Sequence, residues 1–312
     1  MIVRLRALLS VAAAATLLSV APAAPAQAAT DPVAPDFATA FLYTQTVNPN
    51  AEAPGANDWS CRPSAAHPRP VVLVHGTWEN QYNNFAKLSP ALKKAGYCVY
   101  ALNYGAFSLS LAGFNPAMKG TGDISWSAKE LGGFIDRVLA STGTAKVDVV
   151  GHSQGGIVPR QYMRFEGGAS KVHTLVTLGA TNHGTTLSGI ATLAGALGLL
   201  APAPLLLGPA ATQQVVGSDF ITRLNAGGDT EPGVDYLVIA TKYDEVTTPY
   251  QSTFLTAGPG ATVRNVTLQD GCPTDLSEHV SMPYSSRAIG FVLQGLDPAA
   301  PAAPCGVNLP VL

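Results

Sequence analysis

Charged side chains are scarce in this chain. Asp, Glu, Lys and Arg make up only 12% of the residues, and the formal net charge is −2. Because the chain has no basic stripe, it lacks the electrostatic footprint of a nucleic-acid-binding protein, and we expect no nucleic-acid partner. It also lacks His, Cys and Asp residues at metal-ligand spacing. We therefore expect chemistry that needs no metal or organic cofactor, while a structural calcium ion is left open.

Long unbroken apolar runs are equally scarce. The stretch over residues 187–207 is rich in Leu, Ala and Gly, but Pro202 and Pro204 interrupt it. A membrane-spanning helix needs about 20 consecutive apolar residues, so this stretch is not expected to cross a bilayer. We expect no transmembrane anchor.

The first residues have the composition of an export signal. A basic start is followed by the apolar run Ala7 to Val20 and by a small-x-small site at residues 26–28. This order is typical of a secretory signal peptide over residues 1–28. We therefore expect a secreted, extracellular protein with a single domain over residues 29–312.

Cysteine is also rare, with four in the chain. In an exported protein an even number of cysteines indicates disulfides, and four cysteines allow three pairings. We favour Cys61–Cys98, because Cys61 lies just before one predicted strand and Cys98 lies inside the next. The second disulfide would then be Cys272–Cys305, which ties the C-terminal tail to a late loop.

Predicted strands and helices alternate along the chain. The continuous apolar run over residues 70–75 predicts a strand that is buried on both faces, as in a parallel sheet with helices on each side. Further strands are predicted over residues 97–104, 147–151, 171–178, 234–240 and 263–268, and helices over residues 90–95, 123–141 and 283–296 and after Ser153. This pattern predicts an α/β fold with one doubly wound, mostly parallel sheet. Residues 29–69 are interpreted as an irregular surface arm.

A G-x-S-x-G motif, Gly151-His152-Ser153-Gln154-Gly155, lies between a predicted strand and a predicted helix. This is the context of a nucleophile elbow, in which the turn is so sharp that the serine backbone is strained and larger side chains would collide at both glycine positions. Ser153 Oγ would stand at the top of the sheet, where the Gln154 N–H can face a developing negative charge. The alternative is an ordinary strand–turn–helix corner with a serine cap.

Three further segments complete a set with this motif. They are V-L-V-H-G-T-W over residues 72–78, K-Y-D-E-V-T-T-P over 242–249 and E-H-V over 278–280. Together the set resembles the α/β-hydrolases and, more narrowly, the secreted bacterial lipases of the class 2 lipase family. The resemblance covers roughly residues 60–300. It implies an extracellular serine lipase that acts on water-insoluble acylglycerols at a lipid–water interface, and we expect a monomer.

A serine hydroxyl needs a base, and His279 is the predicted one. Hydrolases of this fold order their catalytic residues as Ser, acid, His along the chain. His279 follows the last predicted strand, as this order requires. His183 is the alternative, but it would leave almost no chain for an acid before it. The other histidines precede the nucleophile, lie in the elbow or lie in a strand.

Asp244 is the predicted acid, which would hold the imidazole tautomer and stabilise the imidazolium. It lies a few residues past the strand over residues 234–240, at the carboxyl end where the acid belongs. Glu245 is adjacent but would point elsewhere. The other acids in the same interval are Asp219, Asp229, Asp235, Asp270 and Asp275.

The oxyanion hole is expected to use two main-chain N–H groups. One is that of Gln154, and the other is that of Thr77, which follows the strand over residues 70–75. Trp78 is the alternative second donor. Gly76 would let the backbone approach the substrate closely.

Residues 185–226 do not fit the strand–helix alternation. We interpret them as a mobile apolar cap at the carboxyl edge of the sheet, where open α/β folds bind ligands. The alternative is an ordinary buried helix. Without an apolar cap, a short-chain carboxylesterase or an acyltransferase of the same fold would be favoured over a lipase. A non-catalytic secreted binding protein would show a damaged triad, whereas every part is present here.

Overall fold

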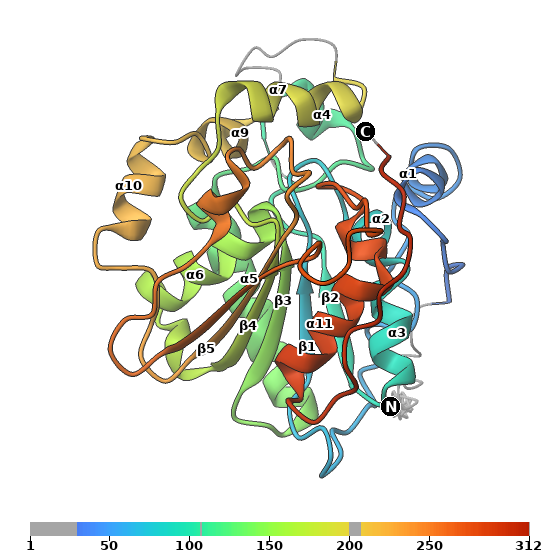
Figure 1. Ribbon diagram of the computed structural model, residues 1–312, viewed down its shortest axis with the longest axis vertical. Coiled ribbons are helices and arrows are strands. Elements are labelled where there is room, and N and C mark those ends of the chain that lie inside the picture. The colour runs from blue at the N-terminus through green and yellow to red at the C-terminus, as the bar shows by residue number, and fades with distance from the viewer. Residues whose placement is uncertain (1–29, 107, 200–206, 312) are drawn as a thin grey trace, which may run out of the picture.

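The structure is a computed structural model that describes residues 30–106, 108–199 and 207–311. Within these residues it forms a six-stranded sheet with the order β2-β1-β3-β4-β5-β6 (Figure 1). The strands are β1 Val71–Val74, β2 Val99–Leu102, β3 Val147–His152, β4 Val172–Leu178, β5 Asp235–Ala240 and β6 Thr262–Thr267. All neighbouring strands are parallel, which confirms the expected α/β class. The predicted signal peptide lies outside the described residues.

Helices cover both faces of the sheet. The α-helices are α1 Phe37–Thr46, α2 Gln81–Phe85, α3 Leu88–Lys94, α4 Leu111–Phe114, α5 Ile124–Thr142, α6 Gln154–Phe165, α7 Leu187–Ala196, α9 Pro209–Gln213, α10 Asp219–Asn225 and α11 Ser286–Leu296. Side chains of a strand point alternately to the two faces, so β1 contributes to two cores. Val72 and Val74 pack with α5, α6 and α10. Val71 and Leu73 pack with α3 and α11 on the opposite face.

Helix α5 shows how local sequence sets an element's ends. Asp123 Oδ1 accepts a hydrogen bond from Trp126 N at 3.0 Å, and Gly143 ends the helix with φ +71°. An Asp cap commonly starts a helix and a left-handed glycine commonly ends one, and the observed bounds lie one residue from the predicted 123–141 at each end.

Two local predictions are wrong. Helix α1 lies inside the predicted irregular arm, where Asp36 caps it and Phe37 and Ala40 are buried. Helix α3 begins at Leu88 and not at Pro90, and Ser89, which could have capped a helix starting at Pro90, instead lies inside it and donates from Oγ to Pro54 O at 2.9 Å.

Two disulfides tie the chain ends to the domain. Cys61–Cys98 joins the residues before β1 to the start of β2, and Cys272–Cys305 joins the C-terminal tail to the loop after β6. This is the pairing that the sequence favoured. In the described part of the chain, no helix has the length and apolarity that crossing a membrane requires.

The predicted insertion over residues 185–226 divides into two parts. Helices α7 and α9 lie above the carboxyl ends of the strands, at the top of Figure 1. Helix α10 instead packs beside α6, and its side chains Phe220, Ile221 and Leu224 belong to the core on that face. The part over residues 200–206 lies outside the described residues. We use "the cap" below for residues 187–199 and 207–215.

Candidate active site

Ser153 occupies the sharp turn between β3 and α6. Its backbone has φ 54° and ψ −126°, a conformation that is strained for any residue with a Cβ. A Cβ on Gly151 would lie 1.9 Å from Gly155 O, and one on Gly155 would lie 1.9 Å from Val74 O. Only glycine fits at either position, and the turn therefore keeps the geometry that a nucleophile elbow needs.

His279 lies in the loop after β6 and is paired with Asp244 from the loop after β5. His279 Nδ1 is 3.0 Å from both carboxylate oxygens of Asp244. The carboxylate is itself held, because its Oδ1 accepts from the N–H groups of Val246 and Thr247 at 3.0 and 2.7 Å. A carboxylate can only accept, so the His279 proton sits on Nδ1 and the Nε2 lone pair is left available. Among the described residues, buried Nε2 has no hydrogen-bond partner.

The environment of His279 favours a cation. Burial alone lowers the pKa of the imidazole, but the charge and hydrogen bond of Asp244, with smaller contributions from Glu79 and Glu278, outweigh it. The pKa of His279 is therefore raised above its usual 6.5. By contrast, burial lowers the pKa of His75 to about 4, so that histidine is neutral near pH 7.

A hydrogen bond joins the elbow to the His279 loop. His152, which precedes Ser153, donates from Nε2 to the main-chain oxygen of His279 at 2.9 Å, and the two imidazole rings are 5.0 Å apart. Ser153 is 2% exposed and His279 is fully buried, so the described conformation covers both. The three predicted catalytic residues, Ser153, Asp244 and His279, thus lie at the same edge of the sheet.

The loop after β1 and the first residue of α6 carry the two groups expected in the oxyanion hole. Within the described residues, no acceptor is found for the main-chain N–H of Thr77 or of Gln154. The N–H of Gly76 instead donates to Glu79 Oε2 and Asn84 Oδ1, at 2.9 and 3.0 Å. The two expected donors are therefore free for a ligand.

Side chains from distant parts of the chain hold this loop. Gln154 Nε2 and Gln214 Nε2 donate to Thr77 Oγ1 at 3.0 and 2.8 Å. Trp78 is fully buried with φ 59°, and its Nε1 donates to Leu207 O at 2.8 Å. Gln214 and Leu207 belong to the cap, which is therefore bonded directly to the loop.

Sequence reasoning missed Glu79, Asn84 and Gln214. Glu79 directly follows the H-G-T-W motif, which is the one local signal that might have marked it, but its burial depends on segments far away. No local pattern marks Asn84 or Gln214.

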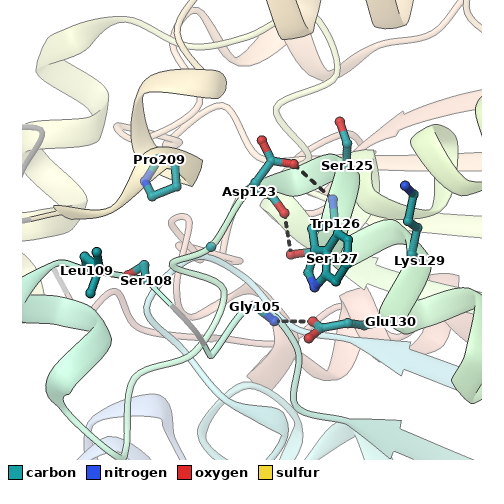
Figure 2. A pocket seen from close by; sticks show the side chains of 11 residues that line it. Gly105, Ser108, Leu109, Asp123, Ser125, Trp126, Ser127, Lys129, Glu130 and Pro209 are labelled. Carbon is teal, nitrogen blue, oxygen red and sulfur yellow. Dashed lines mark hydrogen bonds between the residues drawn. The ribbon is translucent and has the colours of Figure 1, made fainter.

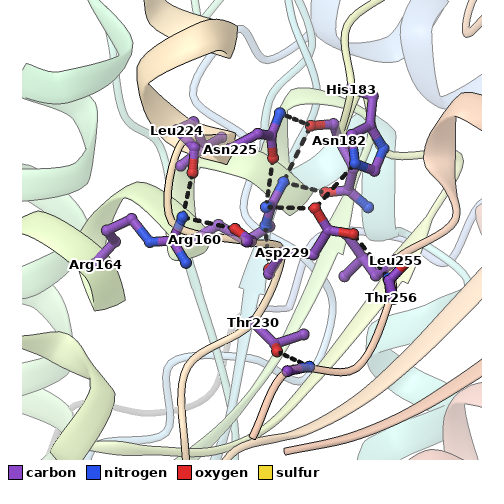
Figure 3. A network of polar contacts seen from close by, with 12 residues as sticks. Arg160, Arg164, Asn182, His183, Leu224, Asn225, Asp229, Thr230, Leu255 and Thr256 are labelled. Atoms are coloured by element: carbon purple, nitrogen blue, oxygen red, sulfur yellow. Dashed lines mark hydrogen bonds and ion pairs between the residues drawn. The ribbon is translucent and has the colours of Figure 1, made fainter.

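His183, the alternative base, belongs to a separate polar network (Figure 3). Its Nε2 is 3.0 Å from Asp229 Oδ1 and its Nδ1 is 2.9 Å from Ser252 O. The same network contains buried Arg160, whose Nη2 donates to Asn225 at 2.7 Å and whose pKa burial lowers to about 10. This network ties α6 and α10 to the loops after β4 and β5.

The pocket in Figure 2 is also separate from these residues. It has a volume of about 580 Å³ and is lined by the start of α5 and by Gly105, Ser108, Leu109 and Pro209. Trp126 forms one apolar wall, and Glu130 Oε2 accepts from the Gly105 N–H at 2.7 Å. In the part of the chain that the structure describes, no three His, Cys, Asp or Glu side chains are grouped to hold a metal ion.

Comparison with known proteins gives a consistent family. A family model described as lipase (class 2) matches residues 68–282. The triacylglycerol lipases of Pseudarthrobacter phenanthrenivorans and Burkholderia plantarii are each 29% identical to this chain over 126 residues. The aligned part is 39% of this chain but 35% and 32% of those proteins, so the chain spans about a third of the length of these curated relatives.

Solved structures share the fold. Aspergillus fumigatus lipase B superposes with a TM-score of 0.61 at 21% identity, over 80% of this chain and 56% of that chain. The mature form of Bacillus licheniformis lipase BlEst2 superposes with a TM-score of 0.55 at 17% identity, over 75% of this chain and 94% of that chain. At these identities the likeness shows the fold alone, which is the α/β-hydrolase fold.

Proposed function

The chain belongs to the lipase (class 2) family, and on this premise we propose that it is a secreted carboxylic ester hydrolase that cleaves water-insoluble acylglycerols. Ser153, Asp244 and His279 form its catalytic triad. The two matching relatives carry the name triacylglycerol lipase, which supports acylglycerols as the substrate class.

The observation that carries the proposal is the His279–Asp244 pair, which lies at the same edge of the sheet as the strained turn of Ser153. Both oxygens of Asp244 contact His279 Nδ1 at 3.0 Å, which leaves Nε2 as the available base. The hydrogen bond from His152 to the main chain of His279 ties this base to the residue next to Ser153. A hydroxyl at an elbow, with a base oriented by a carboxylate, is the arrangement that acyl transfer requires.

The reaction has two steps. In the first, Ser153 Oγ attacks the ester carbonyl carbon while His279 Nε2 takes the hydroxyl proton. The alcohol then leaves with that proton, and an acyl-enzyme remains. In the second step, water gives its proton to His279 and attacks the acyl carbon, after which Ser153 recovers its proton and the acid is released. Asp244 keeps the imidazole oriented and stabilises the imidazolium in both steps.

The main-chain N–H groups of Thr77 and Gln154 stabilise the negative oxygen of each tetrahedral intermediate. Gln154 is the first residue of α6, so the positive end of the helix dipole adds to this stabilisation. Because both donors are main-chain groups, changing either side chain tests the way the loop is held and not the donor itself.

The cap supports a lipid substrate. Its residues Ile190, Leu193, Leu197, Leu207 and Ala211 form an apolar cluster with Trp78, Val246 and Val280. Val246 follows Asp244 closely and Val280 follows His279, so the cluster adjoins the two loops that carry these residues. A further cavity of about 360 Å³ within the cap is lined mainly by Leu, Ile, Ala and Val side chains. We propose that the cap moves aside at a lipid surface and offers this apolar lining to acyl chains.

Export is supported by the composition of the first residues and by the two disulfides. Disulfides persist in oxidising compartments and are rare in the cytosol. Detection of the protein in the culture medium, with residues 1–28 removed, would establish secretion.

The decisive experiment measures hydrolysis of a glycerol ester at concentrations below and above its solubility limit. We expect the rate to rise sharply above the limit, and we expect Ser153→Ala to lose about 10³-fold or more in kcat at every concentration. A smooth saturating curve would indicate a short-chain carboxylesterase with a fixed cap. Activity in Ser153→Ala equal to that of the wild type would refute the proposed nucleophile.

Two matched controls accompany Ser153→Ala. Ser141→Ala removes a serine on α5 whose hydroxyl donates to Val138 O at 3.0 Å. His183→Gln breaks the other well-aligned His–Asp contact, that with Asp229. Both variants should keep activity within about 3-fold of the wild type, because neither side chain contacts the triad.

A further inference from the structure

Glu79 is a buried carboxylate that the reaction described above does not use. Its side chain is 1% exposed, and its Oε2 accepts from the Gly76 N–H at 2.9 Å. A Cβ on Gly76 would lie 2.3 Å from this oxygen and 3.1 Å from Ser153 Cβ. The carboxylate therefore fills the space beside Gly76, next to the nucleophile.

The same oxygen reaches the catalytic histidine through one imidazole ring. Glu79 Oε2 is 3.1 Å from His152 Nδ1, and His152 Nε2 donates to His279 O at 2.9 Å. Asn84 belongs to the same cluster, because its Oδ1 accepts from Gly76 N–H at 3.0 Å and its Nδ2 is 2.8 Å from His152 Nδ1. Glu79 thus contacts Gly76 in the oxyanion loop, which is the loop after β1, and also His152, which is hydrogen-bonded to the main chain of His279.

A buried carboxylate is expensive, since burial removes the water that stabilises its charge. Glu79 Oε1 is buried without a hydrogen-bond partner among the described residues, so its charge is only partly compensated. A glutamine of the same size could hold the Gly76 N–H at lower cost. The hydrogen bond to Gly76 therefore does not by itself explain why this position carries a charged side chain.

We propose that Glu79 is a positioning residue of the catalytic site, whose carboxylate aims the Thr77 N–H through the Gly76 peptide and whose charge stabilises the imidazolium of His279. The first effect follows from geometry, because the two peptides share the Gly76 backbone. The second follows from the position of the charge, one imidazole ring away from His279. This inference rests on the proposed function, because it assigns Glu79 a part in the same reaction.

Other charged and titratable groups also face these residues. Asp244, Glu278 and Glu79 act on His279, and each raises its pKa. Glu245 lies nearby, and burial with the charge of Glu278 raises its own pKa to about 7. The charge of Glu79 also acts to raise the pKa of His75, Tyr104 and Tyr284. Of the charged groups just named, Glu79 also contacts the oxyanion loop, through the Gly76 N–H at 2.9 Å.

The test compares Glu79→Gln with the wild type in kinetics and in NMR titration of the His279 imidazole. We expect kcat to fall by about 10- to 100-fold with KM within about 3-fold, because the oxyanion contact is made in the transition state. We also expect the pKa of His279 to fall by about half a unit to one unit, since a nearby negative charge is lost. The acid limb of the rate profile should move to lower pH by the same amount.

Glu79→Asp keeps the charge but shortens the side chain by one methylene. It should lower kcat through the loop and leave the His279 pKa close to that of the wild type. Glu130→Gln is the matched control, because Glu130 also accepts from a glycine N–H, that of Gly105, without contacting the site. This control should change neither quantity.

A folded Glu79→Gln protein with wild-type kcat and wild-type His279 pKa would overturn the inference. If Glu79→Gln does not fold, Glu79→Asp decides, and an unchanged kcat in that variant would overturn the positioning role. Failure of the proposed function gives a different result from failure of this inference. In that case the wild type hydrolyses no ester, while the NMR titration still reports whether the charge of Glu79 acts on His279.

Discussion

Replacing Gly155 with alanine tests the elbow without reference to any substrate. The added Cβ would lie 1.9 Å from Val74 O and 2.6 Å from His75 O. Ordinary contacts between carbon and a carbonyl oxygen are about 3.3 Å or longer, so the two segments must separate by roughly 1 Å or more. Val74 is held in β1 between β2 and β3, and Gly155 is held in α6, so neither can move freely.

The expected cost is at least about 4 kcal/mol, in the range of the largest effects of single substitutions. At about 2–4 °C per kcal/mol for a domain of this size, Tm should fall by roughly 10 °C. A shift of about 1 Å at Ser153 should also lower kcat by roughly 100-fold. Circular dichroism gives Tm, and ester hydrolysis gives kcat.

Gly133→Ala provides the matched control. Gly133 lies within α5, and a Cβ there would meet nothing within 4 Å. Because alanine is the better helix former, this change should stabilise the protein by about 0.5–1 kcal/mol. If Gly155→Ala unfolds within about 2 °C of the wild type and keeps its kcat, the steric account of the elbow is wrong.

Three further predictions concern the triad and the second polar network. Asp244→Asn should lower kcat by about 10³–10⁴-fold with little change in Tm, because the amide stabilises the wrong imidazole tautomer; steady-state kinetics measures this, and a loss below 10-fold would argue against Asp244 as the acid. The acid limb of kcat/KM should lie above pH 6.5, because His279 must be neutral and its pKa is raised; a limb well below 6.5 would contradict the assigned base. The hydrogen bond to Asp229 raises the pKa of His183, so its stabilisation is present at low pH and is lost as pH rises through the folded pKa. His183→Gln should therefore lower Tm more at about pH 5.5 than at about pH 9, and equal losses would argue against a charged His183.

Most of the sheet was predictable because buried parallel strands appear as short, nearly continuous apolar runs. All six strands fall within about two residues of their predicted bounds. Helix α1 was missed because its apolar residues form no clear stripe. Its position depends on contacts such as that of Phe37 with Tyr284, whose ring centroids are 6.4 Å apart. Such a contact joins distant segments and leaves no local pattern.

The candidate site divides in the same way. The positions of Ser153, His279 and Asp244 relative to the predicted strands pointed to each of them. No sequence pattern indicated the side chains that hold the site. Gln214 lies 137 residues from its partner Thr77, and Glu79 lies 73 residues from His152.

The sequence by itself determined the parts that depend on neighbours along the chain. Two glycines around Ser153 are required by the sterics of a single turn, and alternating strands and helices are required by the burial of apolar runs. Tertiary structure alone decided which parts of residues 185–226 lie above the sheet edge and which join the core, and that Glu79 is buried beside the nucleophile. These outcomes depend on packing between segments far apart in the chain, and local side-chain preferences do not encode such packing.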